Sequence, residues 1–192
     1  KPTPGRLFII SGPSQVGKDT VVRELWHNKK LNLLHIITNT TRARRPGERN
    51  GITYNFYTEI DFKKMINKGE LLEWARVRKA YFGTPKQAVL QVLTAGHHVI
   101  LQIDVQGAAQ IKTKLPQTVL IFIKAESTAE VKRRIFASPK MTLPQKQDRW
   151  REAERELKAQ TSYDYIITNK FGELNKTVQQ ITNIIEQIIQ PR

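Results

Sequence analysis

The stretch Leu7-Phe-Ile-Ile-Ser-Gly12-Pro-Ser-Gln-Val-Gly17-Lys18-Asp19-Thr20 decides the fold, because it joins an apolar run to a glycine-bounded loop. The run Leu7–Ser11 predicts a buried strand, and the apolar spacing within Val21–His27 predicts an amphipathic helix. Between them lies the spacing G-x-x-x-x-G-K, which places backbone N–H groups at the positive end of a helix dipole and so forms an anion cradle. We therefore predict that the following residues bind the phosphates of a nucleotide: Gly12, Pro13, Ser14, Gln15, Val16, Gly17, Lys18, Asp19 and Thr20.

Asp19 is the unusual residue of this loop, because a hydroxyl residue commonly follows the lysine. Its carboxylate has two opposite effects available: it can ligate Mg²⁺ as a hard oxygen donor, or repel the triphosphate. An acidic residue in the first turn of a helix is also favoured by the helix dipole alone. Because Thr20 follows with a hydroxyl group, we expect Asp19 to modify the site and not to abolish it.

The composition indicates a single domain with an ordinary core, since the chain has 192 residues of which 39% are hydrophobic. No apolar run approaches the length of a membrane span, so no membrane association is expected. The absence of Cys excludes disulfides and thiolate metal sites and favours a reducing, cytoplasmic setting. The formal net charge of +15 predicts attraction for anions, but the basic residues are scattered, and we expect no specific nucleic-acid partner.

Strands and helices are expected to alternate along most of the chain, which predicts an α/β fold with a mostly parallel sheet flanked by helices. The expected strands are Leu7–Ser11, Leu34–Ile37, His98–Ile103, Thr118–Ile123 and Tyr165–Thr168. The expected helices are Val21–His27, Asp61–Lys68, Pro85–Thr94, Thr128–Phe136, Gln145–Thr161 and Asn175–Ile189.

Two segments interrupt this alternation. Turn residues and alternating aromatic residues predict a small β-rich insert at about 38–84, within a core formed by 1–37 and 85–192. The segment Ala137–Gln147 has two prolines between helical patterns and predicts an exposed connection, which would form either a lid at about 137–148 or a plain surface loop.

The insert carries residues suited to a phosphorylated second substrate. Three arginines lie within four positions, at Arg42, Arg44 and Arg45, beside a Pro-Gly turn; a guanidinium group binds phosphate through a planar fork. Such a run is also typical of a solvated surface. Tyr54 can donate to a phosphate oxygen, and the Glu73 carboxylate can accept two hydrogen bonds from the N1–H and amino group of guanine.

Taken together, the motifs GPSxxGKxT, TTRxxRPGExxGxxYxF, EW followed by YFGT, IDVQG and DYIITN resemble guanylate kinase, in the right order over nearly the whole chain. The resemblance implies a nucleotide-binding core, a GMP-binding insert, an arginine-bearing lid, and transfer of the γ-phosphoryl group of ATP to GMP with Mg²⁺.

The resemblance also implies a role for individual residues. Lys18, Arg42 and Arg149 would be catalytic, and Asp19, Thr20 and Asp104 would face the metal. The loop Gly12–Thr20 would bind ATP. GMP would be bound by Thr38, Arg42, Arg45, Tyr54, Glu73, Phe82, Thr84 and Asp104.

The sequence departs from the family pattern at four positions. Gln15 replaces a glycine of the loop, and Gln102 replaces the first Asp of a D-x-D motif that ends at Asp104. Phe82 replaces a second Tyr, which leaves the hydroxyl group of Tyr81 as the candidate substitute. Ser138 stands at the position of the lid arginine, and Lys140, Arg133 and Arg134 are the candidates to replace it.

Three alternative functions stay open at this point. The first is a non-catalytic guanylate-kinase-like module that binds a protein or a phosphopeptide. The second is a kinase for dGMP or another phosphorylated acceptor. The third is charge-driven binding of nucleic acid. The sequence does not determine the oligomeric state.

Overall fold

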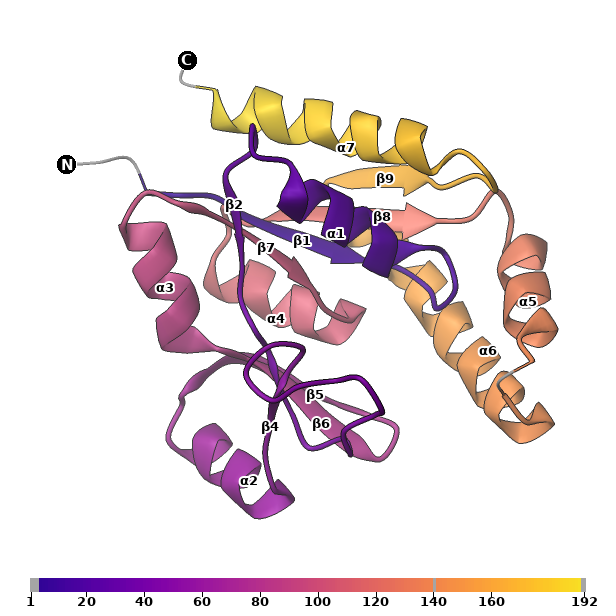
Figure 1. Cartoon of the computed structure of the whole chain (residues 1–192), viewed down its shortest axis with the longest axis horizontal. Coiled ribbons are helices and arrows are strands. Elements are labelled where there is room, and N and C mark those ends of the chain that lie inside the picture. Colours follow the sequence, from indigo (N-terminus) through magenta and orange to yellow (C-terminus); the bar gives the residue numbers. More distant parts are fainter. Residues whose placement is uncertain (1–3, 140, 191–192) are drawn as a thin grey trace.

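The computed structural model describes residues 4–139 and 141–190, which form two sheets with helices packed around them (Figure 1). The strands are β1 (Leu7–Ser11), β2 (Leu33–His35), β3 (Asn39–Thr40), β4 (Asn55–Phe56), β5 (Leu71–Val77), β6 (Ala80–Pro85), β7 (His98–Gln102), β8 (Val119–Lys124) and β9 (Tyr165–Thr168). The helices are α1 (Lys18–His27), α2 (Glu59–Asn67), α3 (Lys86–Thr94), α4 (Val105–Lys114), α5 (Thr128–Ala137), α6 (Leu143–Lys158), the short 3₁₀ turn η1 (Ala159–Ser162) and α7 (Leu174–Ile189).

The first sheet has the order β2-β7-β1-β8-β9, and every neighbouring pair is parallel. All five residues of the central strand β1 are buried, because helices cover both faces. Phe8 and Ile10 belong to the cluster that contains residues of α1 and α7, whereas Leu7 and Ile9 belong to the cluster that contains residues of α3 and α4. This arrangement confirms the predicted parallel α/β fold.

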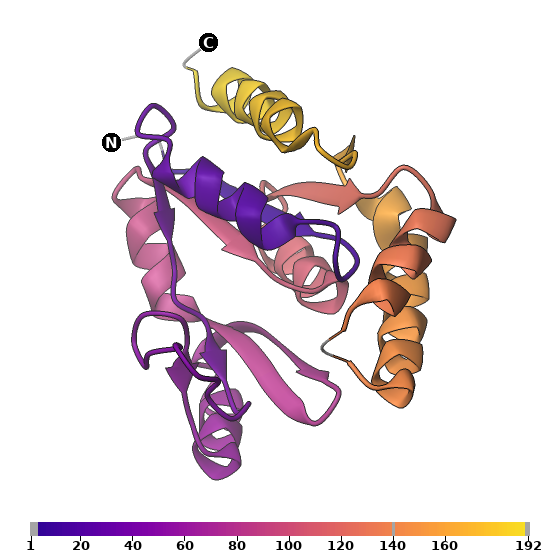
Figure 2. The same ribbon diagram turned by 45° about the vertical axis from the view of Figure 1, so that its right-hand side comes forward.

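The second sheet has the order β4-β3-β6-β5 and is mixed, since β3 pairs parallel with β4 and antiparallel with β6. Figure 2 shows this sheet and α2 as a separate lobe beside the helical layer of the first sheet. Phe62 of α2 is fully buried and stacks on Tyr81 of β6, with 5.5 Å between the ring centroids. The insert therefore has a small apolar core of its own.

Helix α4 joins the two lobes. The Gln110 side chain donates to the carbonyl oxygen of Trp74 in β5 at 2.7 Å and accepts from the Trp74 N–H group at 3.3 Å. The Lys114 ammonium group donates to the carbonyl oxygen of Leu72 at 2.5 Å. Strand β5 is thus tied to a helix that packs on the main sheet.

The observed secondary structure differs from the prediction in two places. Helix α4 was not predicted, because the stretch 105–114 has few large apolar residues; its buried positions are Gly107, Ala108 and Ile111. The connection predicted at Ala137–Gln147 is shorter than expected, since α5 ends at Ala137 and α6 already begins at Leu143. Thr142 and Gln145 form a capping box there, and proline is tolerated in a first helical turn. Within the described part of the chain, no helix is both long and apolar enough to cross a membrane.

Candidate active site

The phosphate loop connects the end of β1 to the first turn of α1. Gly12 has φ 144° and Gly17 has φ 89°, backbone conformations that glycine adopts at low cost. A Cβ atom on Gly12 would lie 2.0 Å from the carbonyl oxygen of Ile123, so no side chain fits. Gly17 is the N-cap residue of α1. The loop therefore ends where the unpaired N–H groups and the dipole of α1 attract an anion.

Asn169, which directly follows β9, binds the backbone of the phosphate loop. Its side-chain amide donates to the carbonyl oxygen of Val16 at 2.8 Å, and its Oδ1 accepts from the Thr177 hydroxyl group at 2.8 Å. Val16 and Asn169 are both buried. Asn169 lies in the motif DYIITN, but its role was not predicted, because the contact to Val16 spans 153 positions of the chain.

Gln15 adopts the left-handed conformation that its position requires, with φ 68°. Its side chain is exposed. A residue with a Cβ atom in this conformation carries a cost of about 1 kcal/mol relative to glycine. The strain expected from the sequence is therefore present in the folded loop.

Lys18 lies across the loop, with its Nζ donating to the carbonyl oxygen of Pro13 at 2.6 Å. The side chain is half-buried. Burial lowers the pKa of Lys18, whereas the nearby carboxylates of Glu156 and Asp19 oppose that shift and the Arg149 charge adds to it. Lys18 thus lies in a partly dehydrated setting, where the attraction between an ammonium group and a phosphate is stronger than in water.

Asp19 and Gln102 face each other beside the loop. The Gln102 side-chain amide donates to Oδ1 of Asp19 at 2.5 Å. Asp19 lies in the first turn of α1 and Gln102 at the end of β7, the strand next to β1. The departure at Gln102 therefore meets the unusual loop residue Asp19 at one point, where they contribute one amide and one carboxylate.

The oxygen ligands near the loop suit a metal that is held mainly by phosphates and water. Asp19 is exposed and Thr20 half-buried, whereas Oδ1 of Asp104 caps α4 by accepting from the N–H groups of Gln106 and Gly107 at 2.7 and 3.0 Å. In residues 4–139 and 141–190, no three His, Cys, Asp or Glu side chains cluster as a metal site. Mg²⁺ commonly takes one or two protein carboxylates together with substrate phosphates.

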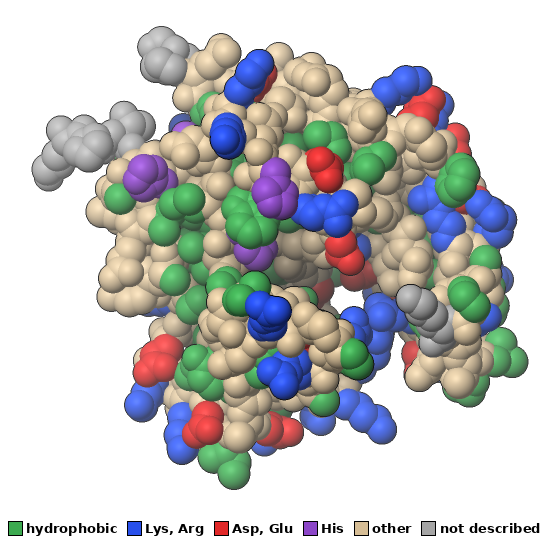
Figure 3. Space-filling model, viewed as in Figure 1, with side chains coloured by type: hydrophobic (Ala, Val, Ile, Leu, Met, Phe, Trp, Pro, Cys, Tyr) green, Lys and Arg blue, Asp and Glu red, His purple; other side chains and the backbone are tan. Residues whose placement is uncertain are grey.

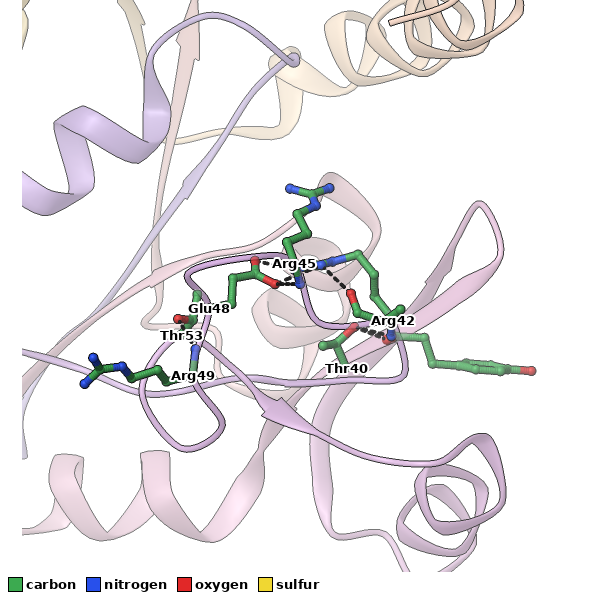
Figure 4. A network of polar contacts seen from close by, with 8 residues as sticks. Thr40, Arg42, Arg45, Glu48, Arg49 and Thr53 are labelled. Carbon is green, nitrogen blue, oxygen red and sulfur yellow. Dashed lines mark hydrogen bonds and ion pairs between the residues drawn. The ribbon is translucent and has the colours of Figure 1, made fainter. Parts of the chain in front are cut away.

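Arg42 is held by Glu48 in a network at the edge of the insert (Figure 4). Its guanidinium group makes two hydrogen bonds to the Glu48 carboxylate, at 2.7 and 3.0 Å, and lies 5.4 Å from the Tyr54 ring centroid. Glu48 also accepts from the Arg45 N–H group at 2.7 Å, and the bond from Arg42 lowers the pKa of Glu48. Glu48 was not predicted as a site residue, although it stands in the motif RPGE.

Arg45 differs from Arg42 in its surroundings. Figure 4 shows its side chain extending away from the Arg42–Glu48 pair. Among the described residues, its guanidinium group has no recorded hydrogen bond or ion pair, whereas its backbone is fixed by Glu48. Arg45 therefore offers all its side-chain donors to an anion in the cleft.

Phe82 lines the cleft on β6, and its ring lies 6.1 Å from that of Tyr54. Burial raises the pKa of the Tyr54 phenol. Tyr81 was predicted to substitute for the hydroxyl group that Phe82 lacks. Its ring instead stacks on Phe62 of α2, on the face of the sheet opposite to Phe82. Since neighbouring residues of a strand point to opposite faces, Tyr81 cannot replace the missing hydroxyl group.

Glu73 lies buried between the two lobes, with 3% of its surface exposed. Its Oε1 accepts from the Thr84 hydroxyl group at 2.6 Å. Its Oε2 lies against α4, since a Cβ atom on Gly107 would be 2.4 Å away. Burial raises the pKa of Glu73 to about 7; the Thr84 bond opposes the shift and the Asp104 carboxylate adds to it. This carboxylate can accept two hydrogen bonds only when ionised.

Helix α6 brings Arg149 to the cleft and Glu156 to the surroundings of Lys18, although Glu156 does not line the cleft. Arg149 is half-buried; burial lowers its pKa, and the neighbouring Arg78 cation adds to that shift. Burial raises the pKa of Glu156 to about 7, although the Lys18 cation opposes this. Glu156 was missed by the sequence analysis, but it follows Arg149 by seven residues, a spacing that places both on one face of the helix.

Arg133 and Arg134, two of the three residues suggested to replace the lid arginine, do not reach the cleft. Ser138 caps the C-terminus of α5, and Arg133 and Arg134 are both bound to Glu130 on the same helix, at 2.7 and 2.6 Å. Neither arginine lines the cleft. Lys140 lies outside the described residues.

A cleft of about 1200 Å³ separates the insert from α1 and α6. Figure 3 shows Lys and Arg side chains beside the opening between the lobes. This volume exceeds that of a typical single-ligand pocket, roughly 300–1,000 Å³. Its lining includes these predicted site residues: Asp19, Thr38, Arg42, Arg45, Tyr54, Phe82 and Arg149. The other predicted residues do not line it: the loop residues Gly12–Lys18, Thr20, the buried Glu73 and Thr84, and the half-buried Asp104.

Comparisons with known proteins agree with this architecture. The family model described as guanylate kinase matches residues 4–188. The chain is 38% identical to the guanylate kinase of Oceanobacillus iheyensis, over 95% of this chain and 87% of that one. It is 39% identical to the guanylate kinase of Caldanaerobacter subterraneus, over 94% and 86% of the two chains.

A solved structure gives the same result in three dimensions. The guanylate kinase of Anaplasma phagocytophilum superposes with a TM-score of 0.80 at 28% identity, covering 99% of this chain and 89% of that one. The family match, the relatives and the superposition each span most of the chain. This protein therefore belongs to the guanylate kinase family.

Proposed function

We propose that this protein transfers the γ-phosphoryl group of ATP to the phosphate of GMP, giving ADP and GDP. The observation that supports this most directly is one cleft lined by Asp19 at the start of α1, by Arg42 and Arg45 of the insert, and by Arg149 of α6. Phosphoryl transfer requires little covalent help from a protein, so alignment of donor and acceptor and neutralisation of charge do most of the work.

The phosphate loop would hold ATP. Its backbone N–H groups and the dipole of α1 attract the phosphates, and Lys18 turns from the Pro13 carbonyl oxygen to the outer phosphates. Arg149 approaches from α6, so that the transferred group lies between cations of two elements. When bound, Mg²⁺ would neutralise phosphate charge; Asp19 and Thr20 are the residues that would hold it.

The insert would hold GMP. Arg45 has its whole guanidinium group available to the phosphate, and Glu48 fixes the orientation of Arg42 beside it. Glu73, supported by Thr84, would accept the N1–H and amino hydrogens of guanine, a pair of donors that adenine lacks. The phosphate of GMP is already ionised at neutral pH, so no strong general base is required.

An enzyme is favoured over a non-catalytic binding module by the relatives, which are named as kinases, and by the retained loop with Gly12, Gly17 and Lys18. The acceptor dGMP is the alternative, because it presents the same base and the same phosphate as GMP. We also propose the cytoplasm as the place of action, on the sequence argument given above.

The test is a coupled phosphotransfer assay with ATP and Mg²⁺, in which GMP, dGMP, AMP, CMP and UMP are offered in turn, beside a Lys18→Ala control. Turnover with GMP that disappears in the control supports the proposal. Folded protein that turns over none of the acceptors would reject it and would direct attention to what the cleft around Arg42 and Arg45 binds.

A further inference from the structure

An ion pair crosses the cleft between the insert and α6. The Nε atom of Arg78 donates to Oε1 of Glu152 at 2.7 Å, and its Nη2 donates to Oε2 at 2.6 Å. The two residues are 74 positions apart in the sequence. Their side chains are 39% and 19% exposed, so the pair is partly shielded from water. A two-point arginine–carboxylate contact fixes orientation as well as distance.

Arg78 is placed for this contact by the turn between β5 and β6. It adopts φ 57°, a left-handed conformation that residues with a Cβ atom seldom take. The turn residues Val77, Arg78, Lys79 and Ala80 all line the cleft. The tip of this hairpin is thus the part of the insert that meets α6.

The pair stands beside Arg149. Arg149 and Glu152 are three residues apart on α6, a spacing that brings two side chains to one helix face. The charges of Arg78 and Glu152 both act on the pKa of Arg149, the first lowering it and the second raising it. All three residues line the cleft.

No other ion pair recorded within residues 4–139 and 141–190 joins the insert to the rest of the chain. Of the eleven pairs among these residues, ten have both partners in the same lobe, either the insert or the core. Nine of those ten join residues no more than six positions apart. The remaining one, between Lys112 and Asp164, lies wholly within the core. The Arg78–Glu152 pair is therefore the charged contact that spans the opening of the cleft.

We propose that Arg78 and Glu152 are positioning residues: their ion pair holds the β5–β6 turn against α6 and so keeps Arg149 beside the insert arginines. The kinetic consequence rests on the proposed phosphotransfer function, but the contact itself does not. It gives the insert and α6 a common position before the second substrate binds, which lowers the ordering that binding must otherwise supply.

A double-mutant cycle tests the pair. Arg78→Gln and Glu152→Gln both keep an unbranched side chain. The left-handed backbone at position 78 therefore costs the glutamine variant about as much as it costs the wild-type arginine. We expect each variant to lower kcat/KM for GMP about threefold to fivefold, the range that a partly exposed ion pair can produce. The double variant should match the single ones, and Arg78→Lys should be intermediate because an ammonium group lacks the planar fork.

The control is Lys63→Gln, which removes an ion pair to Glu59 of similar length, 2.7 Å, that lies within α2 of the same insert. It should leave kcat/KM unchanged. Wild-type kinetics for Glu152→Gln together with a loss in Arg78→Gln would overturn the proposal, since Arg78 would then act on a substrate directly. A double variant whose loss is the product of the single losses would overturn it as well.

A distance measurement on the protein without substrates separates this proposal from the proposed function. The chain has no Cys, so Ile60→Cys in α2 and Glu154→Cys in α6, both exposed, provide the only two label positions for fluorescence energy transfer. We expect a longer and broader distance distribution in Arg78→Gln and Glu152→Gln, and the wild-type distribution in Lys63→Gln. An unchanged distance distribution in all three variants would overturn the positioning role of the Arg78–Glu152 pair even if GMP is turned over. A changed distribution in Arg78→Gln and Glu152→Gln alone would support that role even if no acceptor is turned over.

Discussion

The side-chain amide of Gln102 donates a 2.5 Å hydrogen bond to Oδ1 of Asp19, which joins the end of β7 to the first turn of α1 beside the phosphate loop. From the sequence, Gln102 is a departure from the family pattern and Asp19 is the unusual residue of the loop, and nothing local places the two side by side. In the structure they form one site, in which the carboxylate comes from α1 and the amide from β7. A negative charge is therefore present beside the loop, carried by Asp19, although position 102 has an amide in place of the Asp of the D-x-D motif.

This pairing predicts the outcome of exchanging the two groups. Asp19→Ser should lower kcat/KM for ATP about tenfold and raise the Mg²⁺ concentration needed for half-maximal rate, because the carboxylate is lost. The double change Asp19→Ser with Gln102→Asp should recover most of the rate, since it returns a carboxylate to the same place. Steady-state rates over a Mg²⁺ titration measure both effects. A faster enzyme after Asp19→Ser alone would instead identify Asp19 as a defect of the loop.

Glu73 predicts a pH dependence of guanine recognition. Its pKa of about 7 means that the carboxyl group is protonated below neutral pH and ionised above it. Because only the ionised form accepts both guanine hydrogens, kcat/KM for GMP should fall about tenfold from pH 8 to pH 6. The phosphate of GMP titrates in the same range, with a pKa of about 6, so Glu73→Gln supplies the baseline. Identical pH profiles for wild type and Glu73→Gln would contradict the base-reading role.

Glu156 predicts a pH dependence of stability. Its pKa of about 7 in the folded protein lies above the ordinary value of 4.5, so between these values the folded chain holds the extra proton. The contribution of Glu156 to the free energy of unfolding therefore decreases as the pH rises from about 4.5 to 7. Glu156→Gln should stabilise the protein by roughly 1–2 kcal/mol at pH 8 and little at pH 5. Urea unfolding measures this, with Glu154→Gln, an exposed position of the same helix, as the control; a gain that is equal at both pH values would rule out this cause.

Gln15 predicts a gain in stability from a single change. Because its φ of 68° costs a residue with a Cβ atom more than it costs glycine, Gln15→Gly should raise the free energy of unfolding by about 0.5–1 kcal/mol. Ser14→Gly is the matched control, since Ser14 is not among the residues with positive φ, and it should destabilise the loop. Thermal unfolding of the two variants compares them directly, and a loss in both would show that the left-handed conformation carries no strain.

Local patterns were sufficient for much of the fold. The run Leu7–Ser11 and the helical spacing after Lys18 predict a strand, a loop and a helix, and β1 and α1 confirm them. Helix α4 escaped prediction because two of its three buried residues, Gly107 and Ala108, are small, and a Cβ atom at Gly107 would lie 2.4 Å from the Glu73 carboxylate. The start of α6 at Leu143 was not predicted, because proline is typical of loops and Pro144 lies in the first turn. The Thr142–Gln145 capping box is the local signal for a helix start at this point.

The sequence by itself determined the residue types: a phosphate loop with a carboxylate after its lysine, an insert rich in arginine and aromatic residues, and a glutamate in the insert whose carboxylate can accept two hydrogen bonds. Only the tertiary structure decided which of them meet. The contacts between Asp19 and Gln102, Val16 and Asn169, and Arg78 and Glu152 span 83, 153 and 74 positions. Periodicity and local propensity act over a few residues, whereas these contacts depend on the order of strands in the sheet and on how the insert folds over it.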